Sequence, residues 1–281
     1  METCTTTSQP LQIRTSGQWH EHYARNAGAR LEIPWELGAE LTPEEREAVG
    51  PSLQAWQLGE TSDGRHLMAA ARRYARRQED PLFENVVQQF IREEQRHGSD
   101  LGRFLDLAGI PRIRRDWGDT LFRAVRYCLP SMEIWVTVVI MVETLALLFY
   151  KAVRDATGSP VLRRICDQIL RDEVHHIRFQ YERLAILHRH RSPLLRRATL
   201  ALHRLLFAGV VLAVWGGHHR ALAAGGYAFG SFWRAAWLRM RFAWLRMDPA
   251  RYAAHSKSGH SGAGNGAPVT ADLRAELATD Q

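Results

Sequence analysis

The chain has 281 residues and a formal net charge of +7, which is enough for one large domain or two small ones with a buried core. Its three cysteines are widely spaced and form no Cys-x-x-Cys pair, which argues against a disulfide framework, a cysteine zinc site and a rubredoxin-type site. Residues 1–30 hold no apolar core of signal-peptide length. We therefore expect a cytoplasmic protein.

The positive charge is almost wholly arginine and gathers late in the chain. Between Tyr181 and Arg251 twelve arginines stand against two acids. A bias of this kind, together with abundant alanine, can reflect genome base composition. We therefore discount it as a binding signal and expect no nucleic-acid partner.

Residues 1–52 are polar and mixed, with Pro34, Gly38, Gly50 and Pro51 as helix breakers. Thr42-Pro43 could start a short helix, with a capping threonine and a proline in the first turn. We expect an irregular N-terminal arm on the outside of a helical domain, without chemistry of its own.

Two helices are predicted next. The first runs from about Leu53 to Arg77, where Trp56, Glu60 and Leu67 recur at helical spacing. Asp80-Pro81 then reads as a cap with proline at the first helical position. The second helix follows, and its inner face carries an apolar series that continues into two polar residues. These residues are Phe83, Val86, Val87, Phe90, Ile91, Glu94 and His97.

The third predicted helix is unusually apolar. Ile134 to Tyr150 is a run of 17 residues whose one charge is Glu143. The run is at the lower limit of length for a membrane span, and an acid at its centre would be costly in lipid. We favour a helix buried inside a bundle, with Glu143 bound to a partner. Thr157-Gly158-Ser159-Pro160 then ends this helix and starts a fourth one.

The fourth helix carries Glu173-x-x-His176, and the second carries Glu94-x-x-His97. Three residues apart on a helix, each pair lies on one face about one turn apart. A further glutamate precedes each pair, Glu60 by 34 residues and Glu143 by 30. In two antiparallel hairpins these spacings bring all six side chains to a similar height, and they indicate an internal duplication. Carboxylates and imidazoles in this number suit iron.

The register of the later pair has an alternative, because Asp172 and His175 also stand three residues apart. Only Glu173-His176 mirrors Glu94-His97, and we prefer it for that reason. Asp172, and Glu93 at the matching place, are then candidates to accept a hydrogen bond from the far nitrogen of a liganding histidine. As ordinary surface acids they would need no explanation.

Three aromatic residues share the faces of these glutamates. Tyr150 is seven residues after Glu143 and could gate oxygen or relay an electron, although a packing role is the simpler expectation. Trp56 and Phe90 each lie four residues before a glutamate. They are candidates to line a cavity beside the site, with core packing as the alternative.

The remaining segments flank this bundle. Residues 98–130 contain Gly102, Gly109, Pro111, Gly118 and Pro130, and predict an extension of the second helix over Leu101 to Leu107 followed by a long crossover. Residues 191–252 predict a basic, amphipathic helical hairpin. It contains an uncharged run of eleven residues, from Leu205 to Trp215, which is too short to span a bilayer. From residue 253 to 281 we expect a mostly disordered tail.

Over residues 53–190 the sequence resembles the ferritin-like di-iron carboxylate superfamily, which has one glutamate on each of two helices and Glu-x-x-His on each of the other two. The resemblance implies an all-α fold, a ferritin-like four-helix bundle with a long crossover, here followed by the C-terminal helical hairpin. It also implies two iron ions, with manganese as the alternative for one or both. Glu94 and Glu173 would bridge the ions, Glu60 with His97 would complete one end, and Glu143 with His176 the other.

Some members of the superfamily differ from this chain. Leu101 stands where ribonucleotide reductase small subunits carry a radical tyrosine, and Ile169 stands where arylamine N-oxygenases add a histidine. The Cys-x-x-Cys pairs of rubrerythrins are absent from the sequence. The chain is therefore most similar to bacterial ferritin-like domain proteins outside these families.

The first functional hypothesis is an oxygen-dependent di-iron oxidoreductase, an oxidase or oxygenase acting on a small or acyl-type organic substrate. Its partners would be molecular oxygen, an organic substrate and an electron donor, neither of the last two specified by the sequence, and it would be a monomer or homodimer. The alternative is an iron-handling protein that oxidises ferrous ion without an organic substrate.

A third hypothesis is a metal-stabilised scaffold at the inner membrane surface, with peripheral contact through residues 195–252. For that hairpin we favour simple packing over the bundle.

Overall fold

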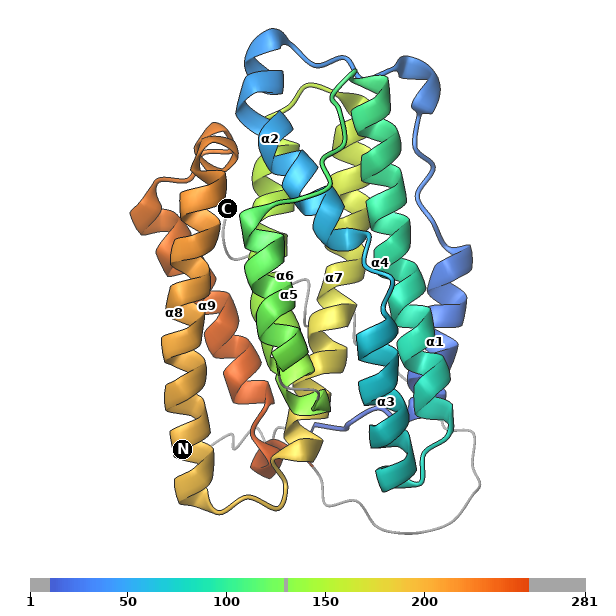
Figure 1. Cartoon of the computed structure of the whole chain (residues 1–281), viewed down its shortest axis with the longest axis vertical. Helices are drawn as coiled ribbons and strands as arrows, with labels where there is room; N and C mark the ends of the chain where they lie inside the picture. Colours follow the sequence, from blue (N-terminus) through green and yellow to red (C-terminus); the bar gives the residue numbers. More distant parts are fainter. Residues whose placement is uncertain (1–10, 129–130, 253–281) are drawn as a thin grey trace, which may run out of the picture.

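The computed structural model describes residues 11–128 and 131–252, and most of them are helical (Figure 1). Within these ranges the chain forms nine α-helices, two short 3-10 helices and no β-strand. One isolated bridge joins Leu11 to Tyr252 near the two ends of the described chain. The all-α class predicted from the sequence is confirmed. The predicted tail over 253–281 lies outside the described residues.

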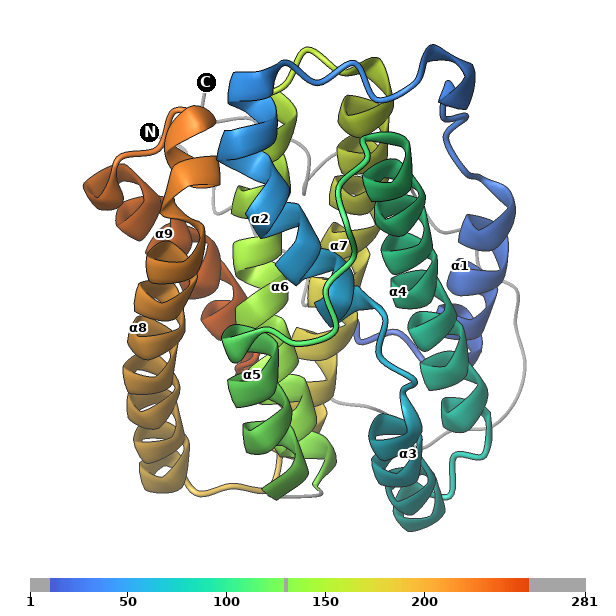
Figure 2. The same cartoon turned by 45° about the horizontal axis from the view of Figure 1, so that its top comes forward.

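The centre of the fold is a pair of closely packed helices, α6 (Met132–Asp155) and α7 (Pro160–Leu187). Beside α7 lies α4 (Leu82–Leu107), and against α4 pack α2 (Pro43–Glu60) and α3 (Arg65–Gln78). Figure 2 shows α2 and α3 following one another along the same side of α4. Together these helices form the four-helix bundle that the sequence predicts.

The start of α7 shows how short-range signals fix helix ends. The Ser159 hydroxyl accepts a hydrogen bond from the Leu162 amide at 3.2 Å, and Pro160 occupies the first helical position. Proline is favoured there because its missing amide would have no helical partner in any case. The predicted start of the fourth helix is confirmed.

The N-terminal arm is not irregular, and the sequence prediction for residues 1–52 is wrong in that respect. Residues Ser16–Gly28 form α1, and α2 already begins at Pro43. Both helices start with a capping box, in which Thr15 pairs with Gln18 and Thr42 with Glu45. Because α1 lies along α4 at the outside of the bundle (Figure 1), it can supply side chains to the interior.

The predicted single helix from Leu53 to Arg77 is also wrong, because the chain breaks between α2 and α3. Gly64 adopts φ +67°, in the left-handed region that favours glycine, and the Asp63 carboxylate accepts from the Arg65 amide at 3.1 Å to start α3. A Cβ at Gly64 would lie 2.6 Å from the Ile91 side chain of α4. The break makes Glu60 the last residue of α2.

α6 is buried inside the bundle, as the sequence predicts. In its most apolar window 72% of the residues are buried, and Glu143 at its centre is only 4% exposed. The apolar core forms where α6 packs on its neighbouring helices. From α6 it includes Ile140, Leu145 and Leu148. The carboxylate of Glu143 therefore lies in protein.

The long crossover between α4 and α6 includes a helix that the sequence analysis did not predict. α4 continues to Leu107, so its predicted extension is confirmed. Residues Trp117–Cys128 form α5, which packs on α6, α2 and α8. α5 thus closes the side of the bundle that lies between α2 and the C-terminal helices.

The C-terminal helices are α8 (Pro193–Ala224) and α9 (Phe229–Arg246). α8 packs on α6 and α2, while α9 packs on α6, α7 and α8. Among the described residues, α6 and α8 are the two helices long and apolar enough to cross a membrane by length and composition. The sequence estimate that the apolar run of α8 is too short was therefore wrong. Unlike α6, α8 has only 17% of its apolar window buried.

Candidate metal centre

The six residues predicted as metal ligands come from the four bundle helices and meet in the interior. Glu60 ends α2, and Glu143 lies at the middle of α6. Glu94 and His97 come from α4, and Glu173 and His176 from α7. Five of the six side chains are at most 7% exposed, and Glu94 is 23% exposed. The fold thus brings together Glu60 and His176, which are more than 100 residues apart in the sequence.

Two groups of three possible ligands share Glu94. In one group, ligand atoms of Glu60, Glu94 and His97 lie within 4.8 Å of one another, and in the other those of Glu94, Glu173 and His176 do. Nδ1 of His176 is 2.9 Å from Glu94 Oε1 and 3.6 Å from Glu173 Oε2. Nδ1 of His97 is 4.0 Å from Glu94 Oε1 and 3.9 Å from Glu173 Oε1. Glu94 and Glu173 therefore lie between the two imidazoles.

Several buried polar atoms of this cluster have no hydrogen-bond partner among the described residues. They are both carboxylate oxygens of Glu143, Oε2 of Glu173 and Nδ1 of His97, whereas Nδ1 of His176 and Oε1 of Glu94 face one another at 2.9 Å. A buried polar atom left unpaired costs folding free energy. Carboxylate oxygens and imidazole nitrogens are also the donors that divalent iron and manganese accept. The donor set and its unpaired atoms fit two such ions.

The electrostatics of the cluster point the same way. Burial, followed by the charge of neighbouring glutamates, raises the pKa of Glu60 and Glu143 well above the usual 4.5. Burial also raises the pKa of Glu173. For Glu94, burial acts in the same sense but is outweighed by His176, and its pKa is lowered. Divalent cations would replace the protons that such a group of carboxyls otherwise needs.

The ring nitrogen of each histidine that faces away from the carboxylate cluster contacts an acid next to the opposite Glu-x-x-His motif. Nε2 of His97 lies 2.9 Å from Asp172 Oδ2, and Nε2 of His176 lies 3.2 Å from Glu93 Oε2. Burial opposes ionisation of Asp172, but hydrogen bonds from His97 and others lower its pKa far below the usual value. An ionised carboxylate can only accept a hydrogen bond. When the imidazole is neutral, as a metal ligand must be, Nε2 therefore carries the hydrogen, and Nδ1 is the nitrogen that faces the carboxylate cluster.

Three side chains that the sequence did not suggest donate hydrogen bonds to Asp172 or Glu93. The Asn26 amide of α1 donates to Asp172 Oδ1 at 2.8 Å and also to Glu93. The Arg96 guanidinium donates to Glu93 Oε1 at 2.6 Å and to Asp172 Oδ2 at 2.9 Å, and Gln168 donates to Asp172 as well. The expectation that the N-terminal arm has no part in the site is therefore wrong. Arg96 lies inside the Glu94-x-x-His97 motif and could have been noticed, whereas nothing local marks Asn26.

The alternative register of the later motif is not the one that faces the cluster. Asp172 points at His97 and Asn26, and the His175 ring lies against His22 of α1, tilted by 58°, with ring centroids 4.3 Å apart. Glu173 and His176 are the pair that the structure brings to the other carboxylates.

Tyr150 is tied directly to the cluster. It is fully buried, and its hydroxyl donates to Glu60 Oε1 at 2.8 Å. Burial and the neighbouring Glu60 raise the pKa of Tyr150 well above 10, so the hydroxyl keeps its proton. The Trp56 ring stacks on Phe149 at 4.6 Å and meets Tyr150 edge-on at 5.5 Å.

A cavity of about 520 Å³ begins at the carboxylates. Glu60, Glu94, Glu143 and Glu173 all line it. Trp56 and Phe90, the two aromatic residues proposed from the sequence, form part of its wall. The rest of the lining is largely apolar and comes from α2, α4, α5, α6 and α8, including Val138, Val142, Val210 and Val214. A cavity of this volume is typical of a site for an organic ligand.

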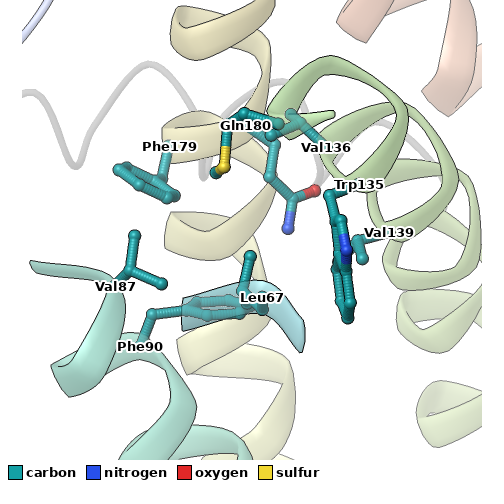
Figure 3. A pocket seen from close by; sticks show the side chains of 9 residues that line it. Leu67, Val87, Phe90, Trp135, Val136, Val139, Phe179 and Gln180 are labelled. Atoms are coloured by element: carbon teal, nitrogen blue, oxygen red, sulfur yellow. The ribbon is translucent and has the colours of Figure 1, made fainter. Parts of the chain in front are cut away.

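A second, much smaller cavity of about 20 Å³ lies on the other side of Phe90. In Figure 3 the Gln180 amide points into the space between Phe90 and Trp135, and Val87, Val136 and Phe179 close the surroundings. This volume is of the order of one water molecule. Apart from Gln180 the walls are apolar.

Comparison with known proteins identifies the fold. No protein-family model and no curated protein matches the sequence. Among solved structures, the chain is similar to two variants of an R2-like ligand-binding oxidase with an aerobically reconstituted Mn/Fe cofactor. Their identities to this chain are 18% and 19%, each with a TM-score of 0.59. The alignments cover 90% of this chain and 98% or 99% of the other. The fold is that of a ferritin-like helical bundle.

Proposed function

We propose that this protein is an oxygen-activating oxidoreductase that holds two metal ions, either two irons or one manganese and one iron, and acts on an apolar organic substrate. The observation that carries the proposal is the continuity between the carboxylate cluster and the large apolar cavity. The similar structures, R2-like ligand-binding oxidases with a Mn/Fe cofactor, support the choice of metals.

In this proposal two metal ions would be held by six side chains, those of Glu60, Glu94, His97, Glu143, Glu173 and His176. When bound and reduced, such a metal pair supplies the electrons that activate oxygen. Neither oxygen of Glu143 meets a hydrogen-bond partner among the described residues, so Glu143 could bind an ion without first giving up such a contact.

The surrounding side chains have separate tasks. Asp172 and Glu93 keep the Nδ1 lone pairs of the imidazoles directed at the cluster. The Tyr150 hydroxyl donates a hydrogen bond to Glu60 Oε1 at 2.8 Å and so holds that carboxylate in position. The apolar wall around Trp56 and Phe90 excludes water, which protects an oxidising centre from side reactions.

An iron-handling protein without organic substrate is the competing function. Ferrous ions would need a polar path into the bundle, whereas the cavity that reaches the carboxylates is mostly lined by apolar side chains. The structure therefore favours the oxidase.

Metal analysis followed by anaerobic reduction and stopped-flow mixing with oxygen tests the proposal. We expect about two metal ions per chain and a transient visible absorption in the intact protein. Glu143→Ala and His176→Ala should lose metal and the transient, whereas Glu84→Ala, at a partly exposed site on α4, should keep both. Unchanged metal content in the two cluster variants would overturn the assignment. Oxygen uptake that is never stimulated by an apolar compound, with iron accumulating beyond two per chain, would favour iron handling instead.

A further inference from the structure

The outer side of α8 is an exposed apolar surface. Leu194, Leu202, Leu205 and Leu212 are between 53% and 77% exposed. The last three of them recur at steps of three and seven, so they lie on one side of the helix. In Figure 1 this helix stands at the edge of the molecule, with the bundle on one side, and only the start of α9 lies outside its upper end. A stripe of this kind marks an interaction site in soluble proteins.

The exposed surface continues onto α5. Trp117 and Leu121 are 56% and 54% exposed, and the Trp117 ring lies against Gly217 of α8. We call the six residues Leu194, Leu202, Leu205, Leu212, Trp117 and Leu121 the α8–α5 face. Trp117 and Leu121 also line the large cavity, as does Leu206 of α8, which is 45% exposed. The cavity therefore lies directly beneath this face.

The charged side chains of the α8–α9 hairpin are all positive. α8 and α9 carry four arginines each, and no acid occurs between Pro193 and Arg246. Arg197, Arg204, Arg234 and Arg241 are exposed. A second copy of the chain docked through the same hairpin would bring together two surfaces with exposed arginines. Like charges of this kind disfavour association, whereas an anionic surface would be attracted.

α8 is held to the protein along its other side. Phe207 and Val211 are fully buried, and the Phe207 ring meets Trp237 and Trp244 of α9 edge-on at 5.6 and 5.9 Å. If α8 crossed a bilayer, these contacts with α9 would be lost. Lying along the interface would keep them and would bury the exposed leucines among acyl chains, with arginines at the headgroups.

From these observations we propose that the α8–α5 face docks on the surface of an anionic lipid bilayer, with α8 lying in the plane of the interface. Docking would bring the wall of the cavity next to the acyl chains, where an apolar compound is most concentrated. The proposal stands whether or not the buried carboxylates hold metal, because none of them belongs to the face.

Vesicle flotation with the full chain tests the proposal. We expect co-flotation with vesicles of phosphatidylcholine and phosphatidylglycerol at low salt. Binding should weaken at high salt, where charge is screened, and be weaker to phosphatidylcholine alone. Leu205→Asp/Leu212→Asp should reduce partitioning at least about tenfold. The matched control is Leu37→Asp/Leu107→Asp, at sites 46% and 44% exposed outside the α8–α5 face, which should bind like the natural chain.

Three results would overturn the proposal. The first is an intact chain that stays at the bottom of the gradient with anionic vesicles, and the second is an α8 variant that floats as well as the natural chain. The third is a dimer, seen in sedimentation, that the α8 substitutions dissociate, because a second copy would then cover the face. Circular dichroism checks that each variant folds, and Leu205→Gln/Leu212→Gln serves as a milder substitution should the aspartates disturb α8.

Discussion

Asp172 and Glu93 show how acids that touch no ligand carboxylate can decide which imidazole nitrogen meets a metal ion. Each precedes the glutamate of its own Glu-x-x-His motif and faces the histidine of the other motif, at 2.9 and 3.2 Å. Arg96 and Asn26 join the two acids into one network. The two halves of the site are therefore positioned together.

Replacing these acids by their amides should weaken metal binding. In Asp172→Asn and Glu93→Gln the amide can donate to Nε2, which favours the tautomer that places a hydrogen on Nδ1 and blocks that ligand atom. We expect a 10- to 100-fold loss of metal affinity in each variant, measured by titration with Mn(II) and followed by metal analysis. The control is Glu84→Gln on the same α4 helix, whose carboxylate lies 3.5 Å from Arg72. Affinities equal to that of the control would show that the acids do not orient the ligands.

The sequence predicts the site residues that lie close together on one helix, and it misses those that reach the site only through packing between helices. Glu94-x-x-His97 and Glu173-x-x-His176 are visible because helical spacing alone places each pair on one face. Asn26 is 146 residues from Asp172, and no periodicity connects them. The role of Asn26 depends on where α1 packs, which the sequence pattern does not specify.

The junction of α2 with α4 illustrates the scale of whole elements. Glu60 ends α2 directly beside Gly98, the residue after His97. A Cβ at Gly98 would lie 2.8 Å from the Thr61 side chain and 3.1 Å from the Glu60 backbone. The absence of a side chain on α4 therefore lets the end of α2 approach closely enough for Glu60 to reach the cluster.

Gly98→Ala should push the end of α2 away from α4. Because backbone rather than a flexible side-chain end is in the way, we expect a cost of about 1–3 kcal/mol in unfolding free energy and at least about a tenfold loss of metal affinity. Denaturant titration and Mn(II) titration measure the two effects. Gly59→Ala is the matched control, since nothing lies within 4 Å of its Cβ, and alanine should be neutral or stabilising there. Equal behaviour of the two variants would contradict the close-approach argument.

Helix starts were easier to predict than helix breaks for a related reason. The start of α7 depends on Ser159 and Pro160 themselves. The break before α3 depends on Gly64 meeting Ile91 of another helix, and the helical periodicity of the sequence runs through it. α1 was missed although Thr15 and Gln18 form a local capping box, because the residues around them are polar and mixed.

At the scale of the whole molecule, the metal-free cluster should set how stability depends on pH. The pKa values of Glu60, Glu143 and Glu173 are raised in the folded chain above the usual 4.5. Those of His97 and His176 are raised above 6.5. A group with a raised pKa stabilises the fold while protonated, and this contribution is lost as pH rises through the folded pKa. Asp172 acts in the opposite sense, but its lowered pKa matters only in acid.

The metal-free protein should therefore lose stability as pH rises from about 5 to 9, whereas bound metal should reverse the trend. Metal binding displaces protons from the ligands, so affinity rises with pH, and a ligand that binds only the folded state stabilises it by mass action. Calorimetry at several pH values, with a chelator or with Mn(II), measures both curves. We expect the difference in Tm between them to widen with pH. A constant difference would contradict the assignment of these buried acids as the ligands.

Glu143→Gln separates the cluster from the general effect of pH on a basic protein. The amide cannot ionise, so without metal the variant should be more stable than the natural chain at pH 8, by a few degrees in Tm, with about 2–4 °C expected per kcal/mol for a chain of this size. The gain should shrink towards pH 5, where Glu143 is protonated, and the variant should gain less than the natural chain from Mn(II). Glu47→Gln, at a side chain 79% exposed on α2, should shift neither curve. Should Glu143→Gln instead destabilise the metal-free protein at pH 8, the buried carboxylate would have a partner other than metal, and the central ligand of the proposed site would be lost.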